Sequence, residues 1–226
     1  MNKWTACAGV LALALVAAIT VPLQAQPRWD LLVTGGWSNG NLSGGRDKLL
    51  GTETRNGFTA GAAALLRSDE IGFEFATRYV QKGGTGTISE TYAVPNFSNV
   101  TTEIGSASVE LDYVHIDILI AGIFDTSTKS YLRGYIGPSL GVLLSADVNG
   151  VVNDEPFEAE IKEKLKPVDW TPTVGASFHY DLGRVSAVVD GRFSMGISSI
   201  DDSGGDYNIK SRTWQVSLGI GIPLAE

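Results

Sequence analysis

The residues of this sequence best suited to catalysis are His115 and His179, the only two histidines of the chain. Both lie in segments of alternating polarity, on the same side of the pattern as nearby serines and acids. Ser139 or Ser177 could supply a hydroxyl nucleophile, and Asp117 or Asp190 could orient an imidazole, as in a Ser–His–acid arrangement. No nucleophile-elbow or other hydrolase signature surrounds either serine. We therefore predict that these groups form hydrogen bonds inside the fold and that the protein is not an enzyme.

A second set of chemistry-bearing residues consists of charged side chains that alternate with apolar ones. They are Glu74, Arg78, Lys82, Asp117, Arg133, Asp190 and Arg192. If these side chains share an interior, opposite charges must pair, because an unpaired buried charge is strongly destabilising. The pattern predicts a salt-bridged polar network with a structural role. A narrow ion pathway or a small ligand pocket is the alternative.

Two acidic segments outside the alternating pattern could bind a cation. Residues 201–206 could bind calcium weakly, but they lack the ligand spacing of an EF-hand. Residues 154–164 mix both signs of charge and could form a short helix. We expect solvated loop charge in both segments, and predict no metal site and no cofactor. Tyr92, Phe97 and Ile161 fall at predicted loop tips and are candidates for binding an external partner.

The alternation that positions these residues has a period of two, which is typical of β-strands. In residues 213–224 the apolar face carries no charge over about eleven residues, roughly the length of a tilted strand that crosses a bilayer. Seven further segments share the pattern, and charges at membrane depth fall on the face opposite the apolar one. The predicted strands are residues 29–37, 58–66, 71–82, 111–124, 131–145, 170–180, 185–197 and 213–224. The sequence therefore predicts apolar side chains facing lipid and a polar interior.

The connections between these strands alternate between short and long. The short ones are residues 67–70, 125–130 and 181–184, and the long ones are 38–56, 83–107, 146–169 and 198–212. Short periplasmic turns and longer external loops are expected of an outer-membrane barrel. Such a closed barrel satisfies every backbone polar group within lipid.

The N-terminus and the net charge restrict the compartment and the partners. Residues 1–25 have the basic start, apolar centre and cleavage site of a signal peptide, which leaves residues 26–226 as one barrel domain. Removing Lys3 from the 17 basic residues leaves 16 against 25 acidic ones, a net charge of −9. This balance argues against a nucleic-acid partner, which would require a basic surface.

Several short motifs resemble those of a known family in their order and spacing. They are GFTAG at 57–61, QKGG at 81–84, YVHI at 113–116, GPSLGVLLSA at 137–146, DGRFSMGI at 190–197 and SLGIG at 217–221. Together they resemble the porin-like outer-membrane β-barrel domain of small eight-stranded proteins. The resemblance implies an outer-membrane location and the eight-stranded fold, with membrane lipids and the barrel-assembly machinery as partners. It implies little about biochemical role.

These observations predict an all-β protein, an eight-stranded antiparallel up-and-down transmembrane β-barrel, acting as a monomer. The predicted function is non-enzymatic, structural or adhesive, and carried by the long external loops. A narrow passive channel for small solutes or ions is the main alternative. A lipid-modifying outer-membrane enzyme and a soluble lipocalin-like carrier are less favoured, and a carrier would need a less charged interior.

Overall fold

The computed structural model describes residues 28–43, 53–92, 100–202 and 209–224. The predicted signal peptide and Phe97 lie outside these ranges. Within them, no helix is long and apolar enough to span a membrane. The chain forms β1 (Arg28–Ser43), β2 (Glu53–Arg67), β3 (Ile71–Tyr92), β4 (Val100–Ser127), β5 (Ser130–Val152), β6 (Glu155–Glu160), the 3-10 turn η1 (Lys162–Lys164), β7 (Val168–Asp181), β8 (Ser186–Met195) and β9 (Lys210–Leu224).

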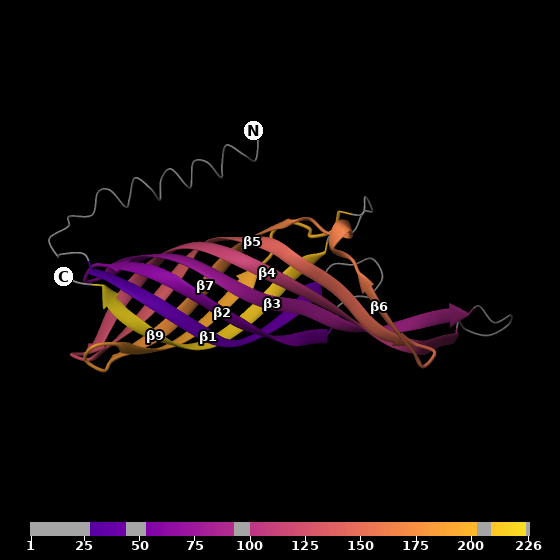
Figure 1. The fold of residues 1–226 in the computed structure, drawn as a ribbon, viewed down its shortest axis with the longest axis horizontal. Helices are drawn as coiled ribbons and strands as arrows, with labels where there is room; N and C mark the ends of the chain where they lie inside the picture. Colours follow the sequence, from indigo (N-terminus) through magenta and orange to yellow (C-terminus); the bar gives the residue numbers. More distant parts are fainter. Residues whose placement is uncertain (1–27, 44–52, 93–99, 203–208, 225–226) are drawn as a thin grey trace, which may run out of the picture.

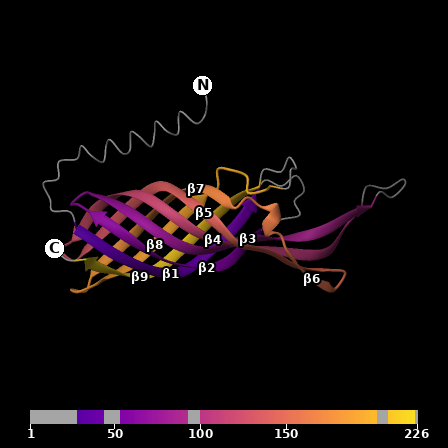
Figure 2. The same ribbon diagram turned by 45° about the horizontal axis from the view of Figure 1, so that its top comes forward.

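Eight of the described strands close into a ring, which confirms the predicted barrel (Figure 1). The order around the ring is β1–β2–β3–β4–β5–β7–β8–β9, every neighbour is antiparallel, and β9 pairs with β1 over residues 29–43 and 210–224. The turned view in Figure 2 shows the tilted strands winding around a common axis. Closure leaves no free sheet edge at membrane depth.

The predicted inward and outward faces are also confirmed, most clearly on β9. Trp214, Val216 and Leu218 point outward with 60%, 52% and 66% of their surface exposed. Gln215 and Ser217, which alternate with them, are buried inside the ring. Exposed apolar side chains recur on the outer face of the other strands, as an outer surface in contact with lipid requires.

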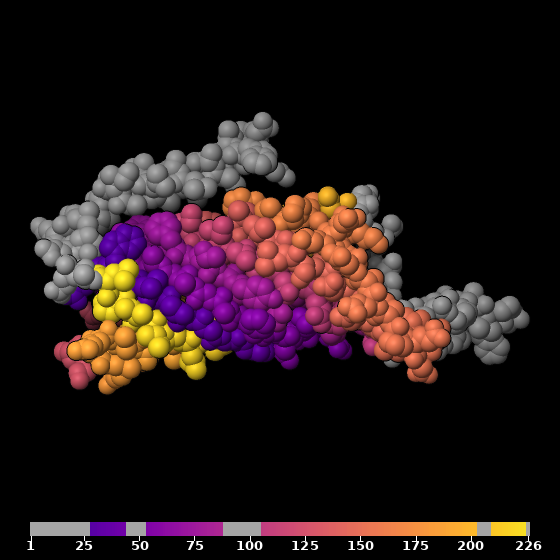
Figure 3. Space-filling model, in the orientation of Figure 1, coloured from indigo at the N-terminus to yellow at the C-terminus, as the bar shows by residue number. Residues whose placement is uncertain are grey.

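The predicted loop boundaries are wrong where strands continue past the barrel. β3 and β4 stay paired out to Tyr92 and Val100, β5 continues to Val152, and β6 pairs with the end of β5. The segments 83–92, 100–112, 145–152 and 155–160 form a sheet that we call the external extension, at the right of Figure 1. Figure 3 shows its β5 and β6 residues, in orange, projecting at the same end. The short helix predicted within 154–164 is mostly strand β6, and only Lys162–Lys164 is helical.

Sequence patterning missed the external extension because polar residues interrupt its alternation, although Val109, Leu111 and Ala146 near the barrel face the external cap. Residues such as Thr85, Thr87 and Ser106 favour strands by backbone and side-chain preference but create no apolar face to detect. β1 and β2 are longer than predicted for the same reason, ending at Ser43 and beginning at Glu53. By contrast, the strand predicted over residues 185–197 is shorter in the structure, where β8 spans Ser186–Met195.

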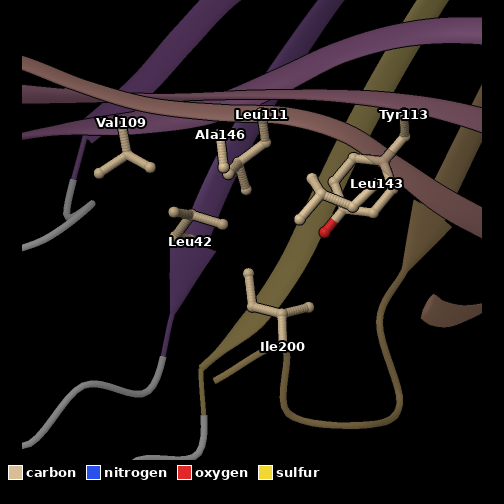
Figure 4. Close-up of a cluster of buried hydrophobic side chains, with 7 residues drawn as sticks. All are labelled: Leu42, Val109, Leu111, Tyr113, Leu143, Ala146 and Ile200. Carbon is tan, nitrogen blue, oxygen red and sulfur yellow. The ribbon is translucent and has the colours of Figure 1, made fainter. Parts of the chain in front are cut away.

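An apolar cluster closes the interior at the end of the barrel that carries the long loops (Figure 4). We call it the external cap; its buried residues are Leu42, Val109, Leu111, Tyr113, Leu143, Ala146 and Ile200. Ile200 reaches it from the connection between β8 and β9. That connection bonds to the one before β7 through Lys166 N to Ile200 O at 2.8 Å and Asp202 N to Lys164 O at 3.0 Å. Two loops therefore hold one apolar side chain over the mouth of the barrel.

Candidate functional site

The structure places all seven charged residues of the predicted network inside the ring. Each is at most 4% exposed. They come from β3, β4, β5 and β8, and each occupies an inward position of its strand's alternation. The strand register thus brings together residues that are far apart in the sequence.

Glu74 is the centre of the network on the side of the short turns. Its carboxylate forms ion pairs with Arg133 Nη1 at 2.5 Å and Arg192 Nη2 at 2.8 Å. Arg192 Nε also donates to Asp190 Oδ1 at 2.7 Å, and the Tyr135 hydroxyl donates to Asp190 Oδ2 at 2.7 Å. Both guanidinium groups lie over the Tyr135 ring, at 4.8 and 4.9 Å from its centroid. This packing fixes the two arginines by charge and by ring contact together.

Asp117 links this group to the middle of the lumen. It accepts from Arg78 Nε at 2.6 Å and from Arg192 Nη1 at 3.4 Å. Arg78 donates in addition to the side-chain oxygen of Gln215, which also accepts from the Thr59 hydroxyl at 3.3 Å. The polar contacts therefore cross from one side of the ring to the other.

Lys82 pairs with Asp169, a residue that the sequence analysis missed. Lys82 Nζ lies 2.9 Å from Asp169 Oδ2, which also accepts from Ser211 Oγ at 2.8 Å. Lys82 lies 4.0 Å above the Tyr113 ring, so the pair sits directly beneath the external cap. Two signals could have identified Asp169. It lies two residues before the inward Thr171, and residues two apart in a strand share a face. The predicted network also had four cations against three acids, and Asp169 makes the numbers equal.

Little free volume remains in the polar part of the lumen. A cavity of about 10 Å³ lies among residues that include Arg78, Arg133 and Arg192. This is room for about one water molecule. A second apolar group, Leu32, Ala63, Leu65, Ala76 and Val188, packs inside the ring beside the charged residues, since Ala76 lies between Glu74 and Arg78 on β3. Nearer the short turns, Asp30 pairs with Arg67 at 2.8 Å. The described interior thus combines a charged network with apolar side chains beside it and with the external cap at one end.

The two histidines do not form a catalytic arrangement among the described residues. His179 Nδ1 contacts the Tyr131 hydroxyl at 2.9 Å and its Nε2 contacts Ser177 Oγ at 3.0 Å, so a serine does meet a histidine. The third partner is a phenol rather than a carboxylate, and Ser177 is only 2% exposed. His115 is buried against Tyr113, and neither of its ring nitrogens has a described hydrogen-bond partner. Both histidines are buried, so a substrate could reach neither of them without opening the barrel.

The loop candidates separate into three cases. Ile161 is partly buried and packs against the external cap, so it is not a free binding residue. Tyr92 ends β3, and Phe97 lies outside the described ranges. The segment 201–206 is described only as far as Asp202. In the part of the chain that the structure describes, no cluster of three acids, histidines or cysteines is arranged to hold a metal ion.

A row of carboxylates crosses the outer face of the external extension. Glu110 on β4 is directly opposite Asp147 on β5, and Asp147 is directly opposite Glu160 on β6. Arg55 neutralises one end of the row through a 2.7 Å ion pair with Glu110. Glu158 adds a further carboxylate, opposite a neutral asparagine on β5. Like charges that face each other across strands are destabilising, so the fold alone does not favour this row.

Most of the chain matches one known protein family, and the solved structures that it resembles are distant. A family model described as "Outer membrane protein beta-barrel domain" matches residues 24–202 of the 226. No curated protein sequence matches the chain. Among solved structures, the attachment invasion locus protein Ail of Yersinia pestis aligns with a TM-score of 0.39 and 10% identity, over 85% of this chain and 98% of that one.

Two further structures give similar values. The outer membrane protein OprG of Pseudomonas aeruginosa aligns with a TM-score of 0.47 and 13% identity, over 90% of this chain and 99% of that one. The outer membrane protease OmpT of Escherichia coli aligns with a TM-score of 0.45 and 10% identity, over 91% and 99%. The extended match to the family model, rather than these distant likenesses, identifies the class of protein.

Proposed function

The chain belongs to the family of outer-membrane proteins with a β-barrel domain, and on this premise we propose that it is a closed, non-enzymatic barrel that binds a partner outside the cell. The external extension is the binding element, and the barrel is its anchor in the outer membrane. The partner carries a positively charged surface. The observation that carries the proposal is the carboxylate row on the outer face of the external extension.

The filled lumen supports a closed barrel rather than a passive channel. Three arginines and three acids interlock across the ring with ion-pair distances of 2.5–3.8 Å. An ion moving through this layer would have to displace paired groups in surroundings where separated charges are strongly disfavoured. The external cap adds an apolar barrier that hydrated ions cross unfavourably.

The carboxylate row supports a cationic partner. The side chain of Glu110 is 38% exposed, Glu160 and Glu158 are exposed, and Asp147 is partly exposed, so these charges can be approached from solvent. A basic surface laid against them would relieve the repulsion between neighbouring strands and would be steered to the site by the same field.

The edge of the external extension is less suited to binding than its face. β6 has no strand partner on its far side among the described strands, which makes it an available edge. However, it carries Pro156 and three glutamates within six residues. Proline and charged side chains are features that keep edge strands from pairing with other chains. Docking through side chains on the face avoids that restriction.

The test is adhesion of lipid vesicles that contain the folded protein to a surface coated with polylysine. We compare the wild type with the double variant Glu158→Gln, Glu160→Gln, and use the double variant Asp69→Asn, Glu70→Gln in a short turn as the charge-matched control. Adhesion should fall for the Glu158→Gln, Glu160→Gln variant and with rising salt, and remain unchanged for the control. Equal adhesion of all three proteins would contradict the proposal.

Conductance across a planar bilayer separates the channel alternative. The wild type should give no discrete current steps. Reproducible steps that are insensitive to the Glu158 and Glu160 substitutions would favour a passive pore. Release of fatty acid or modified lipid from the same vesicles would instead favour an enzyme.

A further inference from the structure

A groove crosses the lipid-facing wall of the barrel on β3, β4, β5 and β7. Its volume is about 540 Å³. The lining is apolar or backbone throughout: Ile71, Ile120, Ala121, Gly122, Gly134, Tyr135, Ile136, Val174 and Gly175. Nothing in the closed-barrel function described above requires a depression at this place.

The strand register explains the shape of the groove. Gly122 on β4 pairs with Gly134 on β5, and Gly134 pairs with Ala176 on β7, so small residues form a continuous floor. Large apolar side chains stand on both sides of this floor. One ridge is Ile120, Ile136 and Val174, and the other is Phe124, Leu132 and Phe178. Residues on one face of a strand repeat every two positions, so the ridges are four residues apart, roughly 13 Å between backbone positions.

Packing within the chain does not account for Gly134. A Cβ added there would meet no atom of the described chain within 4 Å, and its backbone does not have the positive φ that favours glycine. Glycine weakens a strand interior, and in that position it often marks the close approach of a ligand or another backbone. Gly122 differs, because an added Cβ there would lie 3.4 Å from two ring atoms of Phe124.

We propose that this groove is a binding site for one acyl chain of a phospholipid in the periplasmic leaflet. Two observations on the molecule identify the occupant. The groove is continuous with the exposed apolar outer face, including Ile120, Ile136 and Leu132, that already contacts membrane hydrocarbon. It also begins at Ile71, the first residue of β3 after a short turn, and short turns lie on the periplasmic side of such barrels.

The shape of the groove favours a lipid chain over a second barrel. A barrel wall is convex, so a second copy would rest on the two ridges and leave the floor empty. A single flexible hydrocarbon chain can follow the floor and contact both ridges. The small residues then serve the same purpose as at membrane helix interfaces, where they allow a partner to approach the backbone closely.

The test is native mass spectrometry of the barrel extracted from membranes in a mild detergent. The groove is filled by Gly134→Leu. The matched control is Gly35→Leu, on β1, where an added Cβ meets only the Thr59 carbonyl oxygen at 3.9 Å; Gly35 also faces outward and is exposed, whereas Gly134 is partly exposed. Both variants add the same side chain to an open, outward-facing glycine, and a heat-modifiable band checks that each is folded.

The wild type and Gly35→Leu should retain a species heavier than the barrel by one phospholipid, and Gly134→Leu should lose it. Equal retention by all three proteins, or no retained phospholipid in the wild type, would overturn the proposal. A wild-type dimer that only Gly134→Leu abolishes would overturn it as well, since the groove would then hold a second copy. If Gly134→Leu fails to fold, Gly134→Ala should reduce retention in the same direction, and unchanged retention would count against the site.

Discussion

Replacement of Glu74 by glutamine tests whether the lumen charges stabilise the closed barrel. The substitution keeps the size of the side chain but removes the carboxylate that Arg133 and Arg192 share at 2.5 and 2.8 Å. Arg192 retains Asp190 at 2.7 Å and Asp117 at 3.4 Å. Among the described residues, Arg133 retains one acid, Asp190 at 3.8 Å, and the neutral Ser177 hydroxyl at 3.0 Å. The expected loss is therefore dominated by one buried arginine without a close anionic partner.

Removing one member of a buried ion pair costs about 3–5 kcal/mol. A typical slope of about 2 kcal/mol per molar urea converts this loss into a decrease of roughly 1.5–2.5 M in the unfolding midpoint. Tryptophan emission of the barrel folded into lipid vesicles can follow the transition. Equilibrium is verified when unfolding and refolding curves coincide.

The double variant Glu74→Gln, Arg133→Met provides the matched control. It leaves Arg78, Arg192 and Lys82 against Asp117, Asp190 and Asp169, so the charges of the network balance again. The double variant should recover much of the lost stability, because the unpaired arginine is gone. A midpoint for Glu74→Gln within about 0.5 M of the wild type, or a double variant no more stable than the single one, would refute the reasoning.

Three further substitutions probe other layers of the molecule. Leu218→Arg places a charge on the lipid-facing side of β9 and should cost about 2–4 kcal/mol, preventing stable insertion; a wild-type heat shift on a gel would contradict this register. Ile200→Ala removes a buried side chain from the external cap and should cost the cap about 2–5 kcal/mol, seen as faster proteolysis of the external loops with an unchanged heat shift. Lys82→Met leaves Asp169 with the Ser211 hydroxyl as its one remaining side-chain partner among the described residues and should cost about 3–5 kcal/mol. Adding Asp169→Asn should restore stability, and a urea midpoint that does not recover would show that the pair is not the cause.

The barrel was predictable because lipid outside and charge inside impose opposite demands on alternate residues. Every strand that crosses the membrane shows that contrast, so Leu218 and Gln215 could be placed on opposite faces without a structure. The outer part of the external extension has no such contrast, since water contacts much of both its faces. The course of β3 beyond Lys82 therefore depends on pairing with β4, which no local pattern reveals.

The sequence predicts which residues belong to the candidate site better than it predicts how they are arranged. Strand alternation shows that a charged side chain faces the inside of the ring, but it does not show which partner lies across the lumen. That Arg133 and Arg192 converge on Glu74 depends on strand tilt and register around the whole ring. The closure of the external cap by Ile200 was not predictable, because that residue lies in a predicted loop and reaches the mouth only through contacts between two loops.

The lumen network also bears on how the barrel assembles. Glu74 and Arg192 are 118 residues apart, on β3 and β8, so their ion pair forms only when the chain is nearly complete. Until then, early hairpins would bring Glu74, Arg78 and Arg133 to the membrane without their full set of partners. Partly inserted intermediates are consequently unfavourable, and the free energy drops late, as β8 and β9 arrive. Contacts of such long range are typical of slow folding, so we expect insertion to be slow and close to all-or-none.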